Sequence, residues 1–271
     1  MESKPSFSLI FVNYESVKYL GASLRSLFQY EPREMFEVFI VNNDKKEKEA
    51  LRALSAQYPL QVIENTDNTG FGAAINRAAS YARADILGCV NPDILWLQPT
   101  LSSIKDTFDK QSLVGVIGGK LVNEKGETEP WSKGRYPTLW QLAKNNIKSG
   151  IFKQREDKKK KENVSFFDWV SGAALFIRKE VFVATGGFDE RFFLYFEDID
   201  LCYAVSQKGF LIGCDENRTF LHSGGKSFSS ASTQKKHYFV SQRKYFQKHR
   251  PRLESGLLVC LQRLCGKNKK T

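Results

Sequence analysis

The residues of this chain that could do chemistry gather first in a short acidic segment. Glu197, Asp198 and Asp200 are three carboxylates within four residues, and they follow the aromatic run FFLYF at 192–196. Carboxylates this close repel one another, which raises the pKa of at least one unless a cation or a hydrogen-bond donor compensates. Such a cluster suits a general base or a divalent cation. The alternative is structural, because acidic residues also favour the positive end of a helix and the apolar spacing that follows is helical.

Asp93 and His222 are two further candidates. Asp93 ends an Asn-Pro-Asp tripeptide after an apolar run, where it could hold a metal ion that bridges a diphosphate, although the same tripeptide is a turn signal. His222 is one of three histidines, and a lone histidine is usually a structural group unless a carboxylate converges on it. The sequence GGKS at 224–227 ends like a P-loop but lacks the earlier glycine, which excludes an NTPase.

Four short apolar runs, each followed by polar residues, organise the first hundred residues. The runs cover residues 8–12, 38–41, 61–64 and 86–90, and segments with helical spacing separate them. This alternation predicts an α/β fold with a Rossmann-like, mostly parallel central sheet flanked by helices. The carboxyl ends of parallel strands meet at one edge, where ligands bind, so the polar residues favour a ligand site there, with ordinary turn chemistry as the alternative. They are Asn13 and Glu15, then Asn42 to Asp44, then Asn65 to Asn68, and finally Asn91 and Asp93.

The pattern beyond residue 100 is less regular. Residues 114–117 are predicted to form a strand and residues 124–127 a hairpin turn. The charged run KQREDKKKKEN at 153–163 has no apolar periodicity and is predicted to be a mobile loop. Residues 169–177 are uncharged, and the small residues at 171–174 would let a ligand or another backbone approach closely.

The net charge of +11 is concentrated near the C-terminal end. Residues 235–271 contain eleven Lys and Arg side chains and one Glu, whereas residues 1–234 are nearly neutral. A neutral body argues against nucleic acid as its partner, because tracking phosphates needs cations across the docking face. The cationic tail leaves open contact with an anionic surface, either nucleic acid or lipid headgroups. Five cysteines without a C-x-x-C pair exclude a disulfide framework and a zinc knuckle, and they favour the reducing cytoplasm. The sequence shows neither a leader-like segment nor an apolar run long enough to span a bilayer, which predicts a soluble or peripheral protein.

The cationic tail also has an apolar periodicity. Leu253, Leu257, Leu261 and Leu264 fall on one face of a predicted helix, and three lysines follow. One interpretation is that this face packs on the body of the protein or on a dimer partner. The other is an interfacial helix whose cations meet anionic lipid.

Six segments in a fixed order resemble a known family. They are SLIFVNYES from residue 8, VFIVNND from 38, NTDNTGFGAAIN from 65, CVNPD from 89, the long segment WVSGAALFIRKEVFVATGGFDERFFLYFEDIDLC from 169, and LHSGGKS from 221. Together they resemble the family 2 inverting nucleotide-sugar glycosyltransferases of GT-A fold, in particular the rhamnosyltransferase-like branch that builds bacterial surface polysaccharides. The resemblance extends from about residue 6 to residue 251 and includes a closing helix at 238–251.

The resemblance implies a role for each matched position. The residues that match the family's nucleotide-binding edges are Asn13, Tyr14, Glu15, Asn42, Asn43, Asp44, Asn68, Gly70, Phe71, Asn76, Asn91 and Asp93. Those matching the donor-sugar and acceptor region are Trp169, Gly172, Ala173 and Glu197, with Glu197 and Asp198 as the catalytic acidic pair. Asp93 and His222 match ligands of a Mg²⁺ or Mn²⁺ ion. Two positions depart from the pattern, since Asn91 replaces the first Asp of the family's D-x-D and Asn42 stands where many relatives carry Asp.

The implied mechanism is a single inverting displacement in which Asp198 deprotonates the acceptor hydroxyl. The first expectation for the donor is dTDP-rhamnose, and the acceptor is a glycan or a lipid-linked glycan. The alternatives are a transferase of UDP-hexose or UDP-galactofuranose, and a non-catalytic module that binds nucleotide sugars. A glycoside hydrolase is a further alternative that fits less well, because its two acids flank the bond about 5 to 9.5 Å apart and adjacent residues are poorly placed to do so.

The same reasoning divides the chain. Residues 1–232 are predicted to form the catalytic domain, with a nucleotide-binding half at 1–95 and an acceptor half at 96–232. Residues 233–271 are predicted to form a basic helical extension that contacts an anionic membrane or takes part in a homodimer. The expected location is the cytoplasm, peripheral to the cytoplasmic face of the inner membrane.

Overall fold

The computed structural model describes residues 4–142, 164–223 and 231–264. Strands and helices alternate through the first ninety residues, as the sequence predicts. In order they are β1 (Phe7–Asn13), α1 (Val17–Tyr30), β2 (Phe36–Asn42), α2 (Lys48–Ser55), β3 (Leu60–Glu64), α3 (Phe71–Ala79) and β4 (Ile86–Val90), with short 3-10 turns at Arg33–Met35 and Lys45–Glu47. Each predicted strand is confirmed to within two residues at either end.

The remaining elements complete the sheet and add the C-terminal helices. They are β5 (Ile94–Trp96), α4 (Leu101–Lys110), β6 (Val114–Val122), β7 (Lys133–Gly134), β8 (Val164–Phe167), β9 (Trp169–Val170), β10 (Ala174–Arg178), α6 (Lys179–Ala184), α7 (Glu197–Gln207), β11 (Leu211–His222), α8 (Ala231–His249) and α9 (Arg252–Leu264). The predicted turn at 124–127 is confirmed, because Val122 and Thr128 form a bridge around Gly126, whose φ is +77°. The charged run at 153–163 lies outside the described residues.

The central sheet is mostly parallel, as predicted. Eight of its nine strands follow the order β3-β2-β1-β4-β10-β6-β11-β5, and the ninth, β8, pairs with β11 off this path. Strands β3, β2, β1, β4, β6 and β11 run in one direction, while β10, β5 and β8 pair antiparallel to their neighbours. The carboxyl ends of β1, β2, β3 and β4 therefore lie along one edge of the sheet, where the predicted polar residues follow them.

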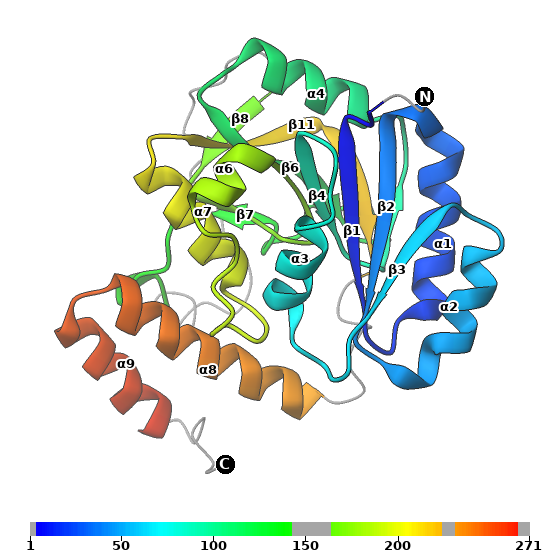
Figure 1. Cartoon of the computed structure of the whole chain (residues 1–271). Coiled ribbons are helices and arrows are strands. Elements are labelled where there is room, and N and C mark those ends of the chain that lie inside the picture. The colour runs from blue at the N-terminus through cyan, green and yellow to red at the C-terminus, as the bar shows by residue number, and fades with distance from the viewer. Residues whose placement is uncertain (1–3, 143–163, 224–230, 265–271) are drawn as a thin grey trace.

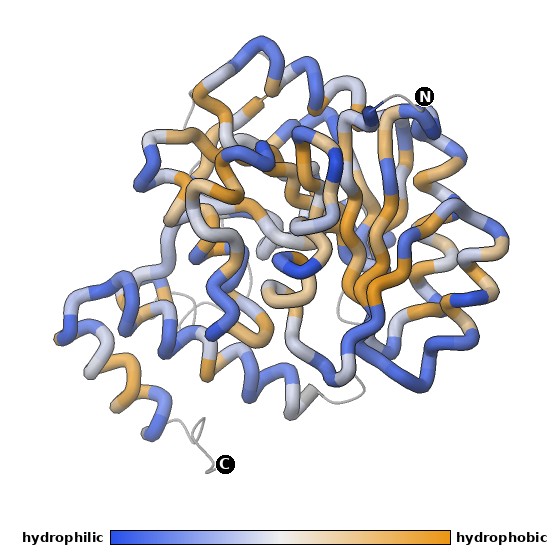
Figure 2. Tube along the Cα trace, viewed as in Figure 1, coloured by the Kyte–Doolittle hydropathy of each residue, from blue (hydrophilic) through white to orange (hydrophobic). Residues whose placement is uncertain are grey.

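Side chains that alternate along β1 serve two hydrophobic cores, one on each face of the sheet. Phe7, Leu9 and Phe11 pack with the leucines of α1 and with α4, while Ile10 faces the core formed with α3, α7 and α8. This period of two is the pattern of a strand that is buried on both faces. Figure 1 shows the helices flanking the sheet, and Figure 2 shows the apolar strands between more polar outer helices.

As far as residue 264, where the described part of the chain ends, the C-terminal extension is helical, but one expectation about it is wrong. Helix α8 packs on the body through Tyr245 and Phe246, which are fully buried. Helix α9 turns Leu258 onto the body but not the described leucines of the predicted face, since Leu253 is 76% exposed and Leu257 and Leu261 are also exposed. It rests on α8 through other side chains, so packing of the leucine face on the protein's own body is excluded. No helix within the described residues is both long and apolar enough to cross a membrane.

Candidate active site

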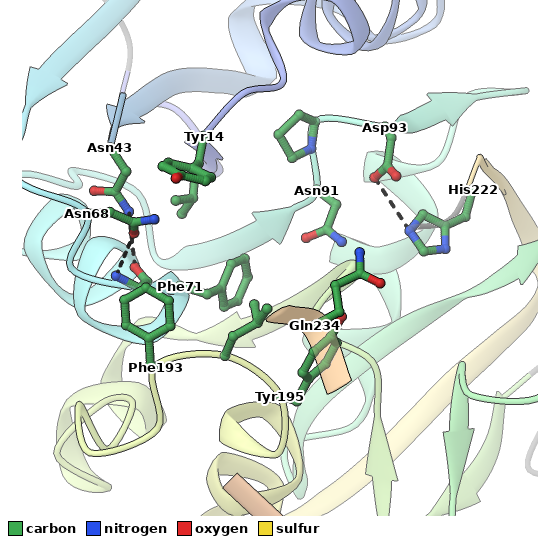
Figure 3. Close-up of a pocket in the computed structure, with 14 residues that line it drawn as sticks. Tyr14, Asn43, Asn68, Phe71, Asn91, Asp93, Phe193, Tyr195, His222 and Gln234 are labelled. Carbon is green, nitrogen blue, oxygen red and sulfur yellow. Dashed lines mark hydrogen bonds and ion pairs between the residues drawn. The ribbon is translucent and has the colours of Figure 1, made fainter. Parts of the chain in front are cut away.

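A cavity of about 190 Å³ lies at the carboxyl ends of the N-terminal strands. The polypeptide reaches it from both halves, because the loop before α7 and the end of β11 complete the walls that the first four strands begin (Figure 3). Eight of the residues singled out in the sequence line it, namely Tyr14, Asn43, Asn68, Gly70, Phe71, Asn91, Asp93 and His222. Phe193, Leu194, Tyr195 and Gln234 line it as well, and sequence reasoning gave none of these four a role.

One wall of the cavity is an amide network built around Asn43. Its Nδ2 donates to Asn68 Oδ1 at 3.1 Å and to the Gly70 carbonyl at 3.3 Å, and its Oδ1 accepts from Asn65 Nδ2 at 2.6 Å. Asn68 Oδ1 also accepts from the Gly70 N–H. These bonds tie the loop that precedes α3 to the end of β2.

Gly70 is the point at which the two halves of the chain meet. Its φ is +85°, and a Cβ at this position would lie 2.4 Å from the carbonyl oxygen of Phe193. The next residue, Phe71, donates its backbone N–H to that same carbonyl at 3.0 Å. A residue without a side chain is therefore required here, both for the left-handed backbone and for the close approach.

Asn13 and Asn42 do not line the cavity. Both are fully buried, and Asn13 Nδ2 donates to Asn42 Oδ1 at 3.1 Å. Asn42 Nδ2 donates to Glu64, and Asn13 Nδ2 also donates to Glu47. Their polar groups are thus used within the protein, where they tie the ends of β1, β2 and β3 together.

Eight other predicted site residues also lie outside the cavity lining, namely Glu15, Asp44, Asn76, Trp169, Gly172, Ala173, Glu197 and Asp198. Glu15 has a φ of 51°, and Asp44 accepts from the Lys46 N–H. Asn76 bridges to the Phe188 carbonyl and N–H, each at 2.9 Å. Trp169 is buried and donates its indole N–H to the Arg135 carbonyl, and the Ala173 carbonyl accepts from the Asn91 N–H. The last contact fixes the strand end that carries Asp93.

The acidic segment begins α7, as the structural alternative predicts, yet its three carboxylates diverge. Asp200 pairs with Lys248 at 2.8 Å and with His249 at 2.5 Å, and so belongs to the contact with α8. Asp198 Oδ2 accepts from the Gly172 N–H at 2.9 Å, and its Oδ1 accepts from the Ile199 N–H at 2.8 Å. The helix start and the predicted catalytic pair are therefore compatible.

Gly172 joins Asp198 to the cavity wall. A Cβ placed on Gly172 would lie 3.3 Å from the ring of Phe71, which lines the cavity, and 3.5 Å from Cβ of Asp198. Asp198 thus sits directly behind the ring of Phe71 and the backbone of Gly172. Glu197 is buried, and its Oε2 has no hydrogen-bond partner. Tyr195 and Phe196, which lead into the helix, both adopt left-handed backbone conformations with φ of 67° and 68°.

The two adjacent carboxylates differ in why their pKa values rise. Burial raises the pKa of Asp198, and the N–H groups of Gly172 and Ile199 oppose that rise. Burial also raises the pKa of Glu197 well above its usual range, and the negative charge of Asp198 adds to this. The sequence predicts that repulsion between neighbouring carboxylates raises the pKa of at least one of them. That carboxylate is Glu197, whose raised pKa favours its neutral form.

Asp93 and His222 lie together at the opposite side of the cavity from the amide network (Figure 3). The Oδ1 atom of Asp93 is buried without a hydrogen-bond partner, 3.4 Å from Nε2 of His222. The other ring nitrogen, Nδ1, lies 2.7 Å from Oε2 of Glu129. Burial alone would lower the pKa of His222, but its contacts with the Asp93 and Glu129 carboxylates outweigh burial and raise the pKa to about 9.

Glu129 is a site residue that sequence reasoning missed. It follows the hairpin turn, carries no motif and comes from an element remote from His222 in the sequence. The signal that could have found it is a general rule. A histidine that binds a metal almost always donates its second N–H to a carboxylate, a backbone carbonyl or water. Within the described residues no three His, Cys, Asp or Glu side chains form a metal-binding cluster. An unpartnered carboxylate oxygen beside an imidazole nitrogen nevertheless fits two protein ligands of a divalent cation, with the other positions left to a diphosphate and water.

Comparison with known proteins gives a consistent result. The model of the glycosyl transferase family 2 domain matches residues 8–182. The N-acetylglucosaminyl-diphospho-decaprenol L-rhamnosyltransferase of Mycobacterium tuberculosis is 23% identical over 222 residues, covering 75% of this chain and 71% of its own. The rhamnosyltransferase WbbL of Escherichia coli is 26% identical over 178 residues, covering 63% and 67%.

A solved structure shares the fold. The mannosyltransferase PcManGT of Pyrobaculum calidifontis, determined with GDP-Man and Mn²⁺, superposes with a TM-score of 0.62 at 16% identity, covering 94% of this chain and 68% of its own. The family match ends at residue 182, so the acidic segment and His222 lie beyond it.

Proposed function

The chain belongs to glycosyl transferase family 2, and we propose that it transfers L-rhamnose from dTDP-rhamnose to a hydroxyl of a glycan or lipid-linked glycan acceptor. The transferase activity follows from the family. The choice of sugar is supported by two relatives that are named rhamnosyltransferases, one of them with a diphospho-decaprenol acceptor in its name. The proposed role is in the synthesis of a surface polysaccharide.

The observation that carries this proposal is the shared cavity. It places the Asn43 network at one side and the Asp93 and His222 pair at the other, with Asp198 behind Phe71 and Gly172. A nucleotide sugar has the same three parts, namely a nucleoside, a diphosphate and a sugar whose anomeric carbon reacts. We assign Tyr14, Asn43 and Asn68 to the nucleoside.

Asp93 and His222 are the residues that would hold a Mg²⁺ or Mn²⁺ ion on the diphosphate. Such an ion, when bound, offsets the negative charge that develops on the departing nucleoside diphosphate. Glu129 would hold the imidazole of His222 in place by accepting from Nδ1–H, which leaves Nε2 directed at Asp93 and the cavity. Asn91 also lines the cavity and brings an amide where a second carboxylate is typical of the family.

Asp198 is assigned as the general base. It removes the proton from the acceptor hydroxyl while that oxygen bonds to the anomeric carbon, and the bond from this carbon to the diphosphate oxygen breaks. A single displacement inverts the configuration at the anomeric carbon. A raised pKa makes Asp198 a stronger base than an exposed aspartate, and the Gly172 and Ile199 N–H groups orient it. Glu197, whose neutral form burial favours, would orient the donor sugar or the acceptor by hydrogen bonding.

Calorimetric titration with a panel of nucleotide sugars tests the proposal. The panel contains dTDP-rhamnose, UDP-glucose, UDP-galactofuranose and GDP-mannose, each with and without Mn²⁺. We expect dTDP-rhamnose to bind most tightly and its affinity to increase with Mn²⁺. Tighter binding of another sugar would replace rhamnose as the substrate, and the absence of binding by the whole panel would refute the role of the cavity. Tight binding without turnover in the presence of glycan acceptors would support a non-catalytic module.

The place of action is part of the same proposal. Cys89, Cys202 and Cys214 are buried free thiols, which suits a reducing compartment. We therefore place the protein at the cytoplasmic face of a membrane, where a lipid-linked acceptor would be accessible.

A further inference from the structure

Helix α9 exposes three leucines on one face, while Leu258 and Gln262 on the opposite face are buried. Leu253, Leu257 and Leu261 are 76%, 47% and 46% exposed, whereas Gln262 is only 3% exposed. Gly256 and Cys260 lie on the same exposed face, and we call these five residues the leucine strip. A helix that only covers a core turns most of its leucines inward, so packing on the body alone does not account for three exposed leucines on one face. Figure 2 shows the apolar colour of α9 at the outer edge of the molecule.

Specific contacts fix this orientation. Gln262 Nε2 donates to Gln242 Oε1 of α8 at 2.7 Å, in a position that is buried from solvent. Leu258 is buried beside it, and the Ser255 hydroxyl donates to the Phe246 carbonyl at 2.8 Å. Turning the leucine strip toward the body would break these contacts and leave the Gln242 amide covered without its partner.

The surroundings of the leucine strip are cationic. Arg252 and Arg263, near the two ends of α9, are both exposed. The one acidic residue of the helix, Glu254, is paired with Arg250 at 2.6 Å. The sequence after the helix adds three lysines and no acid in residues 265–271. A partner for this surface must therefore accept apolar side chains and carry negative charge.

We propose that the leucine strip docks on an anionic lipid bilayer, with the leucines between the headgroups and the flanking cations on lipid phosphates. A second copy of the chain fits less well, because it would bring two strongly cationic tails together. Amphipathic helices with basic flanks bind membranes through buried apolar area together with attraction to anionic lipid.

The position of α8 gives this docking a consequence for the active site. Gln234, in the first turn of α8, lines the cavity, and Ser241 of α8 donates to the Leu194 carbonyl at 2.7 Å. Because α9 is fixed on α8, a bilayer that holds α9 also sets the distance from the cavity to the lipid surface (Figure 1). The docking does not depend on which sugar is transferred.

Flotation of the full-length protein with lipid vesicles tests the proposal. The vesicles contain either phosphatidylcholine alone or phosphatidylcholine with 30% phosphatidylglycerol, at about 0.05 M and 0.5 M NaCl. We expect binding to the anionic vesicles at low salt and at least tenfold weaker binding to the neutral ones. High salt should weaken the anionic binding, since the exposed cations are screened. Failure of the wild type to bind anionic vesicles, or equal binding to both, would overturn the proposal.

A matched pair of variants assigns the binding to the leucine strip. In the first, Leu253, Leu257 and Leu261 are changed to Ser, and in the control Leu97, Leu113 and Leu211 are changed to Ser. The control leucines are exposed to 45%, 63% and 42% and lie outside α9. We expect the first variant to lose at least tenfold in vesicle affinity and the control to match the wild type.

Two readouts separate the remaining explanations. A wild-type dimer in gel filtration that the leucine-strip variant converts to a monomer, without any vesicle binding, would assign the strip to a second copy. Changing Arg252 and Arg263 to Gln keeps every leucine and should reduce binding only to the anionic vesicles. Equal binding by the wild type and the leucine-strip variant would refute docking by the strip. Donor binding by calorimetry should stay unchanged in every variant, so this test is independent of the proposed transferase mechanism.

Discussion

Replacing Asp198 by Asn removes the proposed base with little change in shape. Asn retains one oxygen, which can still accept from the Gly172 N–H, but its NH₂ group then faces the Ile199 N–H. One backbone donor loses its acceptor, which costs about 1–3 kcal/mol, and losing a charge at the start of α7 costs about 0.3–1 kcal/mol more. Relief of a buried charge offsets part of this, because burial raises the pKa of Asp198. The variant should therefore remain folded at 25 °C.

The effect on catalysis is expected to be much larger. General-base assistance is worth about 10²–10⁴ in rate, or about 2.7–5.5 kcal/mol at 1.36 kcal/mol for each factor of ten. The assay measures release of the nucleoside diphosphate from the best donor of the binding panel at saturating acceptor. We expect kcat to fall by 10² or more while the Kd of the nucleoside diphosphate stays within about threefold, because Asp198 is not assigned to nucleotide binding.

Asp200→Asn is the matched control for Asp198→Asn. It makes the same chemical change in the same turn of α7, but its carboxylate bonds Lys248 and His249 of α8. We expect Asp200→Asn to be destabilised in urea and to retain its turnover per folded molecule. If Asp198→Asn kept kcat within about threefold of the wild type while folded, the assignment of Asp198 as the base would be wrong.

Three further substitutions test the other parts of the site. Glu129→Gln should weaken Mn²⁺ binding in the presence of nucleoside diphosphate by about 10–100-fold in calorimetry, because His222 loses its charged partner. The control Glu127→Gln, in the same hairpin, should leave Mn²⁺ binding unchanged. Equal Mn²⁺ affinities of the two variants would contradict the role of Glu129. Gly70→Ala should lower the free energy of unfolding in urea by more than Gly126→Ala does. Both glycines have positive φ, but only a Cβ at position 70 would meet a backbone oxygen, that of Phe193, at 2.4 Å. Equal losses would contradict the importance of this close approach. Glu197→Gln should become more stable relative to the wild type as pH rises from 5 to 8. A carboxyl whose pKa is raised by folding makes the folded protein less stable as pH rises above its ordinary pKa of 4.5, and Gln lacks this effect. A stability difference between the two proteins that does not change with pH would contradict the raised pKa of Glu197.

The sequence predicts the strand edges well because two signals coincide there. Apolar residues with β propensity end at Asn13, Asn42 and Asn91, and the chain must turn at these points. Which of the edge residues face the ligand is not predictable in the same way. Asn42 and Asn43 are adjacent and chemically identical, yet one is fully buried in contact with Asn13 while the other lines the cavity. Neighbouring side chains at a strand end point to opposite faces, and local sequence does not say which face is open.

Two other features depend on contacts between distant segments. Asp200 has the same local sequence environment as Asp198, and only the docking of α8 assigns it to Lys248 and His249. The leucine face of α9 has the periodicity of a packing helix, and nothing local indicates that Gln262 rather than the leucines contacts α8. Periodicity identifies the face of a helix that is apolar, whereas the charges around that face suggest what it contacts.

The charge balance around Asp93 links the departure at Asn91 to the residue that the sequence did not reveal. With Asn in place of Asp at position 91, Asp93 is the one carboxylate that lines the cavity among the described residues. Glu129 brings a second negative charge, but it acts on the far nitrogen of His222, 2.7 Å away. A carboxylate placed behind the imidazole increases its basicity as a ligand without adding like-charge repulsion beside Asp93. Under the proposed assignment, Asp93 and His222 would supply only part of a cation's shell, and the oxygens of a diphosphate would supply more of it.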